Sequence, residues 1–98
     1  MKSDVEETLR QRNSVHGNFD SNARCSQDIK RIINEHLGMR VRREGTLPLN
    51  DVQLEALDLI ATKISRIVSG NANHTDHWHD IQGYAALAEK TCNPVNGR

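Results

Sequence analysis

Residues 50–70 decide the fold and read Asn-Asp-Val-Gln-Leu-Glu-Ala-Leu-Asp-Leu-Ile-Ala-Thr-Lys-Ile-Ser-Arg-Ile-Val-Ser-Gly. Apolar side chains recur in this stretch at helical spacing, which predicts an amphipathic helix over residues 51–69. Asn50 and Gln53 have the spacing of a capping box at its start, and Gly70 is placed to end it. The apolar stripe consists of Leu57, Ile60, Ala61, Ile64, Ile67 and Val68.

Two further helices are predicted before this stretch. Ser3 and Glu6 form a capping-box pattern that starts a short helix. Residues 13–20 break that helix, with Gly17 as a turn residue. A second helix is predicted over residues 21–37, followed by a basic loop over residues 39–49. It carries an apolar face and ends at glycine, its residues being Cys25, Ile29, Ile32, Ile33, His36 and the terminal Gly38.

A fourth helix is predicted after residues 71–74. Thr75 is expected to cap it, and Asp76 is favourably placed in its first turn. Gly83 lies in its interior, where glycine costs about 1 kcal/mol relative to alanine. We therefore expect Gly83 to serve close helix packing or access of a ligand.

The chain is predicted to be all-α, because it has no alternating run of the kind typical of strands. We expect one domain over residues 1–91, a small bundle of three to four helices, and a flexible tail over residues 92–98. Apolar residues make up 36% of the 98 residues and aromatic residues 3%. Since this is a thin core for a chain of this size, we expect a homo-oligomer.

Charge and hydropathy exclude several classes of protein. Lys and Arg number 13, as do Asp and Glu, and this balance argues against a nucleic-acid partner. No apolar run approaches the roughly 20 residues that span a bilayer. The first residues lack the apolar segment of a signal peptide, so we expect a cytoplasmic protein without a membrane partner. Cys25 and Cys92 lack a paired spacing, and a structural disulfide is not expected.

The carboxylates of the last helix are the first candidates for chemistry. Asp76 and Asp80 lie one helical turn apart, and Tyr84 continues the same face. Asp76 is interpreted either as a partner of the helix dipole or as a metal ligand. Asp80 has small and apolar neighbours, so it is expected either to form a salt bridge, for example with Arg66, or to bind a metal.

A second acidic pair lies on the helix over residues 51–69. Glu55 and Asp58 belong to a solvated face in a monomer, but in an oligomer that face could meet another helix. Together with Asp76 and Asp80 they could hold Mg²⁺, which prefers oxygen ligands and bridges to phosphates. Lys63 and Arg66 are interpreted either as phosphate contacts or as surface charges.

Histidines form a third group of candidates. His77 and His79 point about 160° apart on a helix and cannot share an ion, so Zn²⁺ is disfavoured. His77 is either a core histidine or a phosphate contact, and Tyr84 is included with it among the substrate contacts. His16 and Phe19, in the segment that precedes the second helix, either cap a pocket or pack a turn.

Three motifs resemble a family of short, uncharacterised phage and prophage proteins. The first is Arg-Asn-Ser-x-His-Gly-x-Phe over residues 12–19. The second is Glu-Ala-Leu-Asp-x-Ile-Ala-x-Lys-Ile-x-Arg-Ile over residues 55–67. The third is Asp-x-Trp-x-Asp-Ile-x-Gly-Tyr-Ala over residues 76–85. The resemblance implies a phage or prophage origin and, with it, the host cytoplasm. It implies no particular activity.

A more distant similarity is to the all-α nucleoside triphosphate pyrophosphohydrolases of the MazG and dimeric dUTPase superfamily. It implies a Mg²⁺-dependent enzyme in which Glu55, Asp58 and Asp80 act in catalysis and bind the metal with Asp76. Lys63, Arg66, His77 and Tyr84 would then bind a nucleotide. The chain departs from that pattern, because Leu54 precedes Glu55 and His77 stands three residues before Asp80.

Three functions follow as hypotheses. The first is a MazG-like nucleoside triphosphate pyrophosphohydrolase that uses Mg²⁺. The second is a non-catalytic phage protein on the same helical scaffold, which binds a nucleotide, another phosphate-bearing small molecule or a host protein, for example in counter-defence. The third is a purely structural oligomer whose acidic residues form interhelical salt bridges. The sequence alone does not decide whether the chain is an enzyme.

Overall fold

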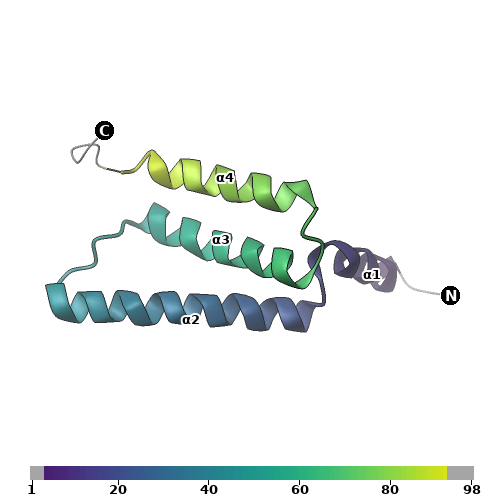
Figure 1. The fold of residues 1–98 in the computed structure, drawn as a ribbon, viewed down its shortest axis with the longest axis horizontal. Coiled ribbons are helices and arrows are strands. Elements are labelled where there is room, and N and C mark those ends of the chain that lie inside the picture. Colours follow the sequence, from purple (N-terminus) through teal and green to yellow (C-terminus); the bar gives the residue numbers. More distant parts are fainter. Residues whose placement is uncertain (1–3, 93–98) are drawn as a thin grey trace.

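The computed structural model describes residues 4–92, which form four helices (Figure 1). These are α1 (Asp4–His16), α2 (Phe19–Glu44), α3 (Asp51–Ser69) and α4 (Thr75–Glu89). No strand occurs within residues 4–92. The all-α prediction is therefore confirmed, whereas Ser3 and most of the predicted tail lie outside the described residues.

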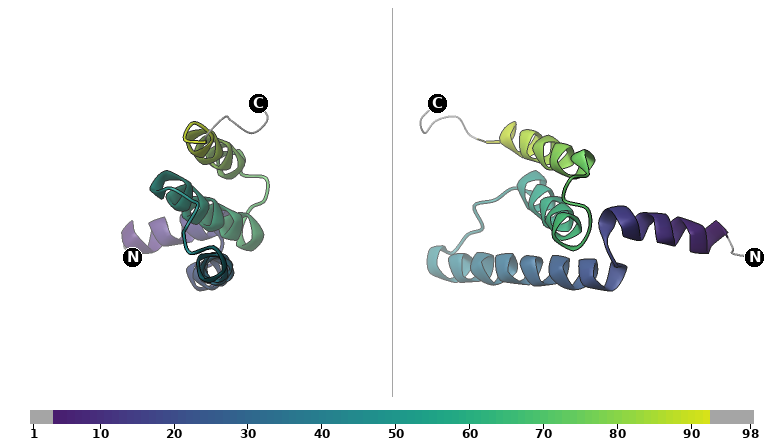
Figure 2. Two further views of the ribbon diagram at one scale, coloured as in Figure 1. Left: turned by 90° about the vertical axis from the view of Figure 1, so that its left-hand side faces the viewer. Right: turned by 45° about the vertical axis from the view of Figure 1, so that its right-hand side comes forward.

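The helix α3 occupies the middle of the molecule. It packs against α2 on one side and α4 on the other, and within the described chain α2 and α4 do not meet (Figures 1 and 2). The helix α1 extends from the end of this layer where α2 begins and α3 ends (Figure 2). The molecule is elongated as a result, with extents of 58 × 29 × 20 Å.

The start of α3 has the predicted capping box. The Asn50 side chain accepts a hydrogen bond from the Gln53 amide at 2.8 Å, and the Gln53 side chain accepts one from the Asn50 amide at 3.1 Å. Asn50 also donates to the Thr91 hydroxyl at 3.0 Å, which joins the start of α3 to the end of α4. The predicted bounds of this helix are confirmed.

The prediction for α2 was wrong at its C-terminal end. The helix continues through Gly38 to Glu44, so the arginines assigned to a loop belong to its last two turns. An interior glycine costs about 1 kcal/mol, which a continuous hydrogen-bond ladder and an Arg40–Glu44 ion pair at 2.9 Å can offset. The helix ends at Gly45, whose φ of 77° is the left-handed conformation typical of a glycine cap.

Two other helix ends differ from their predictions. Helix α1 runs to His16, so the predicted break shrinks to Gly17 and Asn18, and Asn18 caps α2 through hydrogen bonds to two amides of its first turn. His74 rather than Thr75 is the N-cap of α4. The tight turn that Asn71 forms by accepting from the His74 amide at 3.1 Å brings Thr75 into the helix.

The core of the described chain is small. Ala56 and Ala61 are the fully buried apolar residues of residues 4–92, and most large apolar side chains remain partly exposed. The thin core expected from composition is therefore present in the structure. None of the described helices combines the length and apolar character needed to cross a bilayer.

Candidate functional site

Two glycines interlock the turns at one end of the helical layer. Gly17, between α1 and α2, has a φ of 83°, and a Cβ on it would overlap the backbone of Ser69. A Cβ on Gly70 would lie 2.5 Å from the Gly17 nitrogen. The Asn71 amide donates to the Val15 carbonyl at 3.0 Å across the same contact. Glycine at both positions thus lets the end of α3 approach the α1–α2 turn.

This approach gathers three histidines. His16 Nδ1 lies 3.2 Å from His77 Nε2, and the His74 ring centroid lies 4.8 Å from that of His77. Burial and, after it, the charge of Arg66 lower the pKa of His16 to about 4. Burial and then the charge of Lys63 lower the pKa of His77, which is 1% exposed. Both rings are therefore neutral near pH 7, and one can donate a hydrogen bond to the other.

A cavity of about 270 Å³ opens beside this cluster, between α1, α2 and α3. None of the described residues that line it is acidic. Its hydrogen-bonding side chains comprise arginines, amides, hydroxyls and one histidine, and its apolar walls include Leu9, Phe19 and Ala23. The polar lining residues are Arg12, Asn13, His16, Asn22, Ser26, Gln27, Thr62, Ser65 and Arg66.

The electrostatics of the cavity favour an anionic ligand. Arg66 and Arg12 both help to lower the pKa of His16, which shows that their positive field reaches the lining. Asn22 is held by hydrogen bonds from its amide nitrogen to the carbonyls of His16 and Gly17. The buried Asn22 Oδ1 has no hydrogen-bond partner within the described chain, and it offers one acceptor to a ligand.

Asp80 is engaged on the other side of α3. Lys63 Nζ lies 2.7 Å from Asp80 Oδ2, and the Lys63 side chain is only 13% exposed. The hydrogen bond from Lys63 lowers the pKa of Asp80. Asp80 thus forms a salt bridge, as one interpretation of the sequence had it, but its partner is Lys63 rather than Arg66.

The other predicted carboxylates lie apart from Asp80. Glu55 is about 12 Å from Lys63 along α3, and Asp76 is one turn beyond Asp80 in the opposite direction. Glu55 and Asp58 are exposed, and the Asp76 side chain is 77% exposed. Within residues 4–92, no group of three or more His, Cys, Asp or Glu side chains has a geometry that could hold a metal. The four carboxylates do not converge within a single chain, and the Mg²⁺ site stays a prediction.

The predicted substrate contacts are also distributed over the molecule. Arg66 lines the cavity beside α1, whereas Lys63 is paired with Asp80. His77 lies in the buried histidine cluster, and Tyr84 lines an apolar groove between α3 and α4. Of these four residues, Arg66 alone lines the cavity between α1, α2 and α3.

The family model described as a domain of unknown function, DUF6378, matches residues 3–92 of the chain. The chain belongs to the DUF6378 family. No curated protein and no solved structure matches it. The DUF6378 match covers every helix of the fold and the whole lining of the cavity.

Sequence reasoning missed part of the site in this DUF6378 chain. Arg12, Asn13 and Asn22 line the cavity and were not predicted as functional. A signal was present, because the motif over residues 12–19 supplies five of the lining residues, among them His16 and Phe19. His16 and Phe19 both line the cavity, and His16 also packs against His77 at the turn.

Proposed function

We propose that this chain binds a phosphate-bearing small molecule, a nucleotide in the first instance, in the cavity between α1, α2 and α3, and does not hydrolyse it. The observation that carries the proposal is the lining of the cavity, in which Arg12 and Arg66 occur with neutral donors and without an acidic residue. Guanidinium groups bind phosphate oxygens through paired, charge-assisted hydrogen bonds. An acid-free lining avoids repelling the ligand.

The shape of the cavity suits a nucleotide held by its phosphate end. A volume of about 270 Å³ lies near the lower limit of small-molecule sites, enough for a phosphate and part of a sugar. Phe19 lines the cavity and is 74% exposed, so its ring is available for a base to stack on. The unpaired Asn22 Oδ1 would accept a hydrogen bond from a ligand hydroxyl or amino group.

The positions of the carboxylates speak against hydrolysis. Asp80 is paired with Lys63, a cation with little access to water, and Asp76 lies at the other end of the layer from Glu55. A Mg²⁺-dependent pyrophosphohydrolase requires carboxylates that converge on one ion. This favours a non-catalytic binding protein over an enzyme.

A MazG-like pyrophosphohydrolase is the second candidate. One observation favours it: Glu55 and Asp58 lie about one turn apart on α3, both are exposed, and no ion pair engages either of them within the described residues. Such a pair is open to a metal ion. A titration with ATP, with and without Mg²⁺, distinguishes the two candidates.

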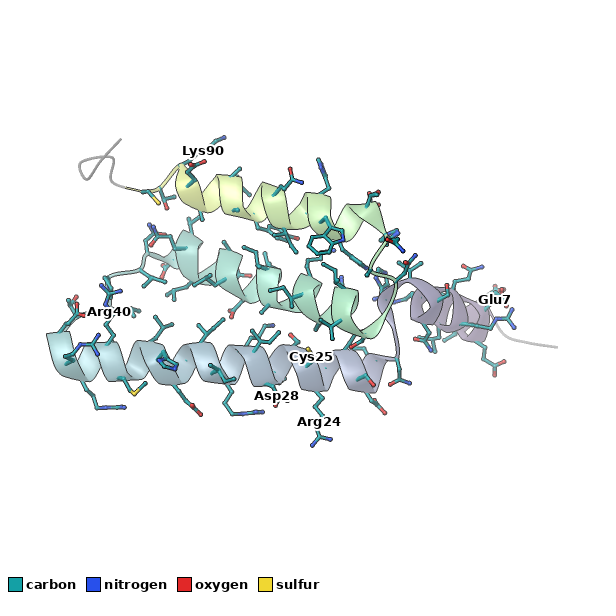
Figure 3. The ribbon with its side chains drawn as sticks, viewed as in Figure 1. Glu7, Arg24, Cys25, Asp28, Arg40 and Lys90 are labelled. Atoms are coloured by element: carbon teal, nitrogen blue, oxygen red, sulfur yellow. The ribbon has the colours of Figure 1, made fainter. Side chains whose placement is uncertain are left out.

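The test is a calorimetric titration of the protein with ATP, first in EDTA and then in Mg²⁺, followed by an assay for pyrophosphate. The proposal predicts binding in EDTA, affinity at least about tenfold weaker in Arg66→Gln, and no pyrophosphate. Arg24→Gln is the matched control, because Arg24 points away from α3 on the outer side of α2 (Figure 3).

Three results would overturn the proposal. Equal affinity in wild type, Arg66→Gln and Arg24→Gln would place the ligand elsewhere, and absence of any binding would direct the non-catalytic hypothesis to a protein partner. Pyrophosphate release that needs Mg²⁺ and is lost in Asp58→Asn would establish the second candidate instead.

A further inference from the structure

Gly83 has no packing explanation within the described chain. It lies in the interior of α4, is exposed, and a Cβ added to it would meet no atom within 4 Å. Alanine at such a position is favoured by about 1 kcal/mol. A glycine that is costly and has no neighbour points to close approach by something outside this chain.

An apolar groove lies beside Gly83. It occupies about 310 Å³ between the first half of α3 and the last half of α4. Leu87, one turn after Gly83, and Val52 line it and are 54% and 46% exposed. Ala56, Leu59 and Tyr84 complete its apolar walls. The groove thus offers side chains that would normally be covered.

The exposed surface of the chain is larger than that of a compact monomer of the same mass. The chain exposes 7346 Å², whereas a compact monomer of 11.1 kDa exposes about 5,700 Å². The excess of roughly 1,700 Å² falls within the area that each subunit of an obligate homodimer buries, about 1,000–2,500 Å². The radius of gyration of 16.8 Å, against about 13 Å for a compact chain of this length, agrees with this.

We propose that a second copy of this chain packs on the α3–α4 groove, with Gly83 allowing the two α4 helices to approach closely. A second copy fits better than a different partner, because a core limited to Ala56 and Ala61 needs permanent burial rather than occasional contact.

The charges around the groove suit two identical chains. The net charge of the chain is zero, so two copies do not repel each other. The groove has the acidic Asp51 and Glu55 on one side, and Lys90 lies next to Leu87 on the other. A rim of both signs can complement itself across a two-fold axis. The inference does not rest on the proposed function, because the arginine-lined cavity lies at the other end of α3.

The test is sedimentation equilibrium of wild type, Gly83→Gln and Leu87→Glu over a range of protein concentrations. We expect a dimer for wild type and at least about tenfold weaker association for both variants. Gly38→Gln is the matched control, because Gly38 is also an interior helical glycine and its Cβ would meet only the Arg42 guanidinium at 3.6 Å. The control is expected to associate as wild type does.

Two results would overturn the inference. A wild-type chain that stays monomeric at every concentration would remove the dimer, and association unchanged in both variants would remove this surface. Thermal melting provides a second measurement if a variant folds poorly. In a monomer Gly83→Gln would raise the melting temperature through its helix propensity, whereas in the proposed dimer it lowers the melting temperature at a fixed concentration.

Discussion

At the scale of single residues, His16 and His77 face each other as neutral rings held by the interlocked turns. Their pKa values lie below the ordinary 6.5, that of His16 at about 4. Between these values the unfolded chain binds more protons than the folded chain does. The free energy of unfolding must therefore fall as the pH falls from 6.5 toward 4.

This predicts that urea denaturation at about pH 5 shows lower stability than at about pH 7, and that His16→Gln reduces the difference. The groups around the pair do not reverse the sign, because Lys63, Arg66 and Arg12 are cations and add to the penalty on protonation. The exposed His36 provides the control His36→Gln. An equal loss of pH dependence in both variants would show that the pair does not cause it.

The Lys63–Asp80 ion pair carries a second prediction. Replacing Asp80 by Asn leaves Lys63, which is 13% exposed, without its counter-charge, so the melting temperature should fall. Asp58→Asn, at an exposed position, should leave the melting temperature unchanged.

A metal ion that binds the native state raises the melting temperature. We expect Mg²⁺ to leave the melting temperature of wild type unchanged. A clear upward shift would instead support a metal site.

At the scale of helices, α2 predicts opposite effects at its two glycines. Gly38→Ala should raise the free energy of unfolding by about 0.5–1 kcal/mol, because its Cβ has room and the position is helical. Gly45→Ala should lower it by about 1 kcal/mol, because a φ of 77° is strained for alanine. Chemical denaturation of the two variants measures both. Two changes of the same sign would contradict the observed helix end.

Helices were predictable where the local rules agreed. Periodicity, a capping box and a terminal glycine all specified α3, and its bounds were correct. The rules conflicted at Gly38, which ends many helices but here lies in one, because Gly45 provides the left-handed cap seven residues later. His74 was not predictable as the cap of α4, because a turn built by Asn71 rather than a capping side chain sets that end.

At the scale of the whole molecule, the cavity required tertiary information. Arg12, Asn22 and Arg66 come from three helices, and the packing of α2 on α3 together with the approach of Gly17 to Gly70 brings them together. No periodicity in the sequence encodes that contact. Asp80 shows the same limit, because the sequence indicated that it needs a partner but could not tell Lys63 from Arg66.

The thin core, by contrast, was predictable from composition, and it affects how the whole molecule is arranged. A layer of three helices in which α2 and α4 do not touch leaves both of its faces open within the described chain. The cavity lies at one end of α3 and the apolar groove at the other. The proposed ligand binding and the proposed association therefore use separate surfaces of one layer.

The most direct test of the ligand cavity is an amide NMR titration of the protein with ATP in EDTA, repeated with Mg²⁺. The account predicts chemical-shift changes that cluster at residues 12–22 and 62–66, are present in EDTA, and need a much higher ATP concentration in Arg66→Gln. Shift changes confined to Glu55, Asp58, Asp76 and Asp80, and seen only with Mg²⁺, would contradict it.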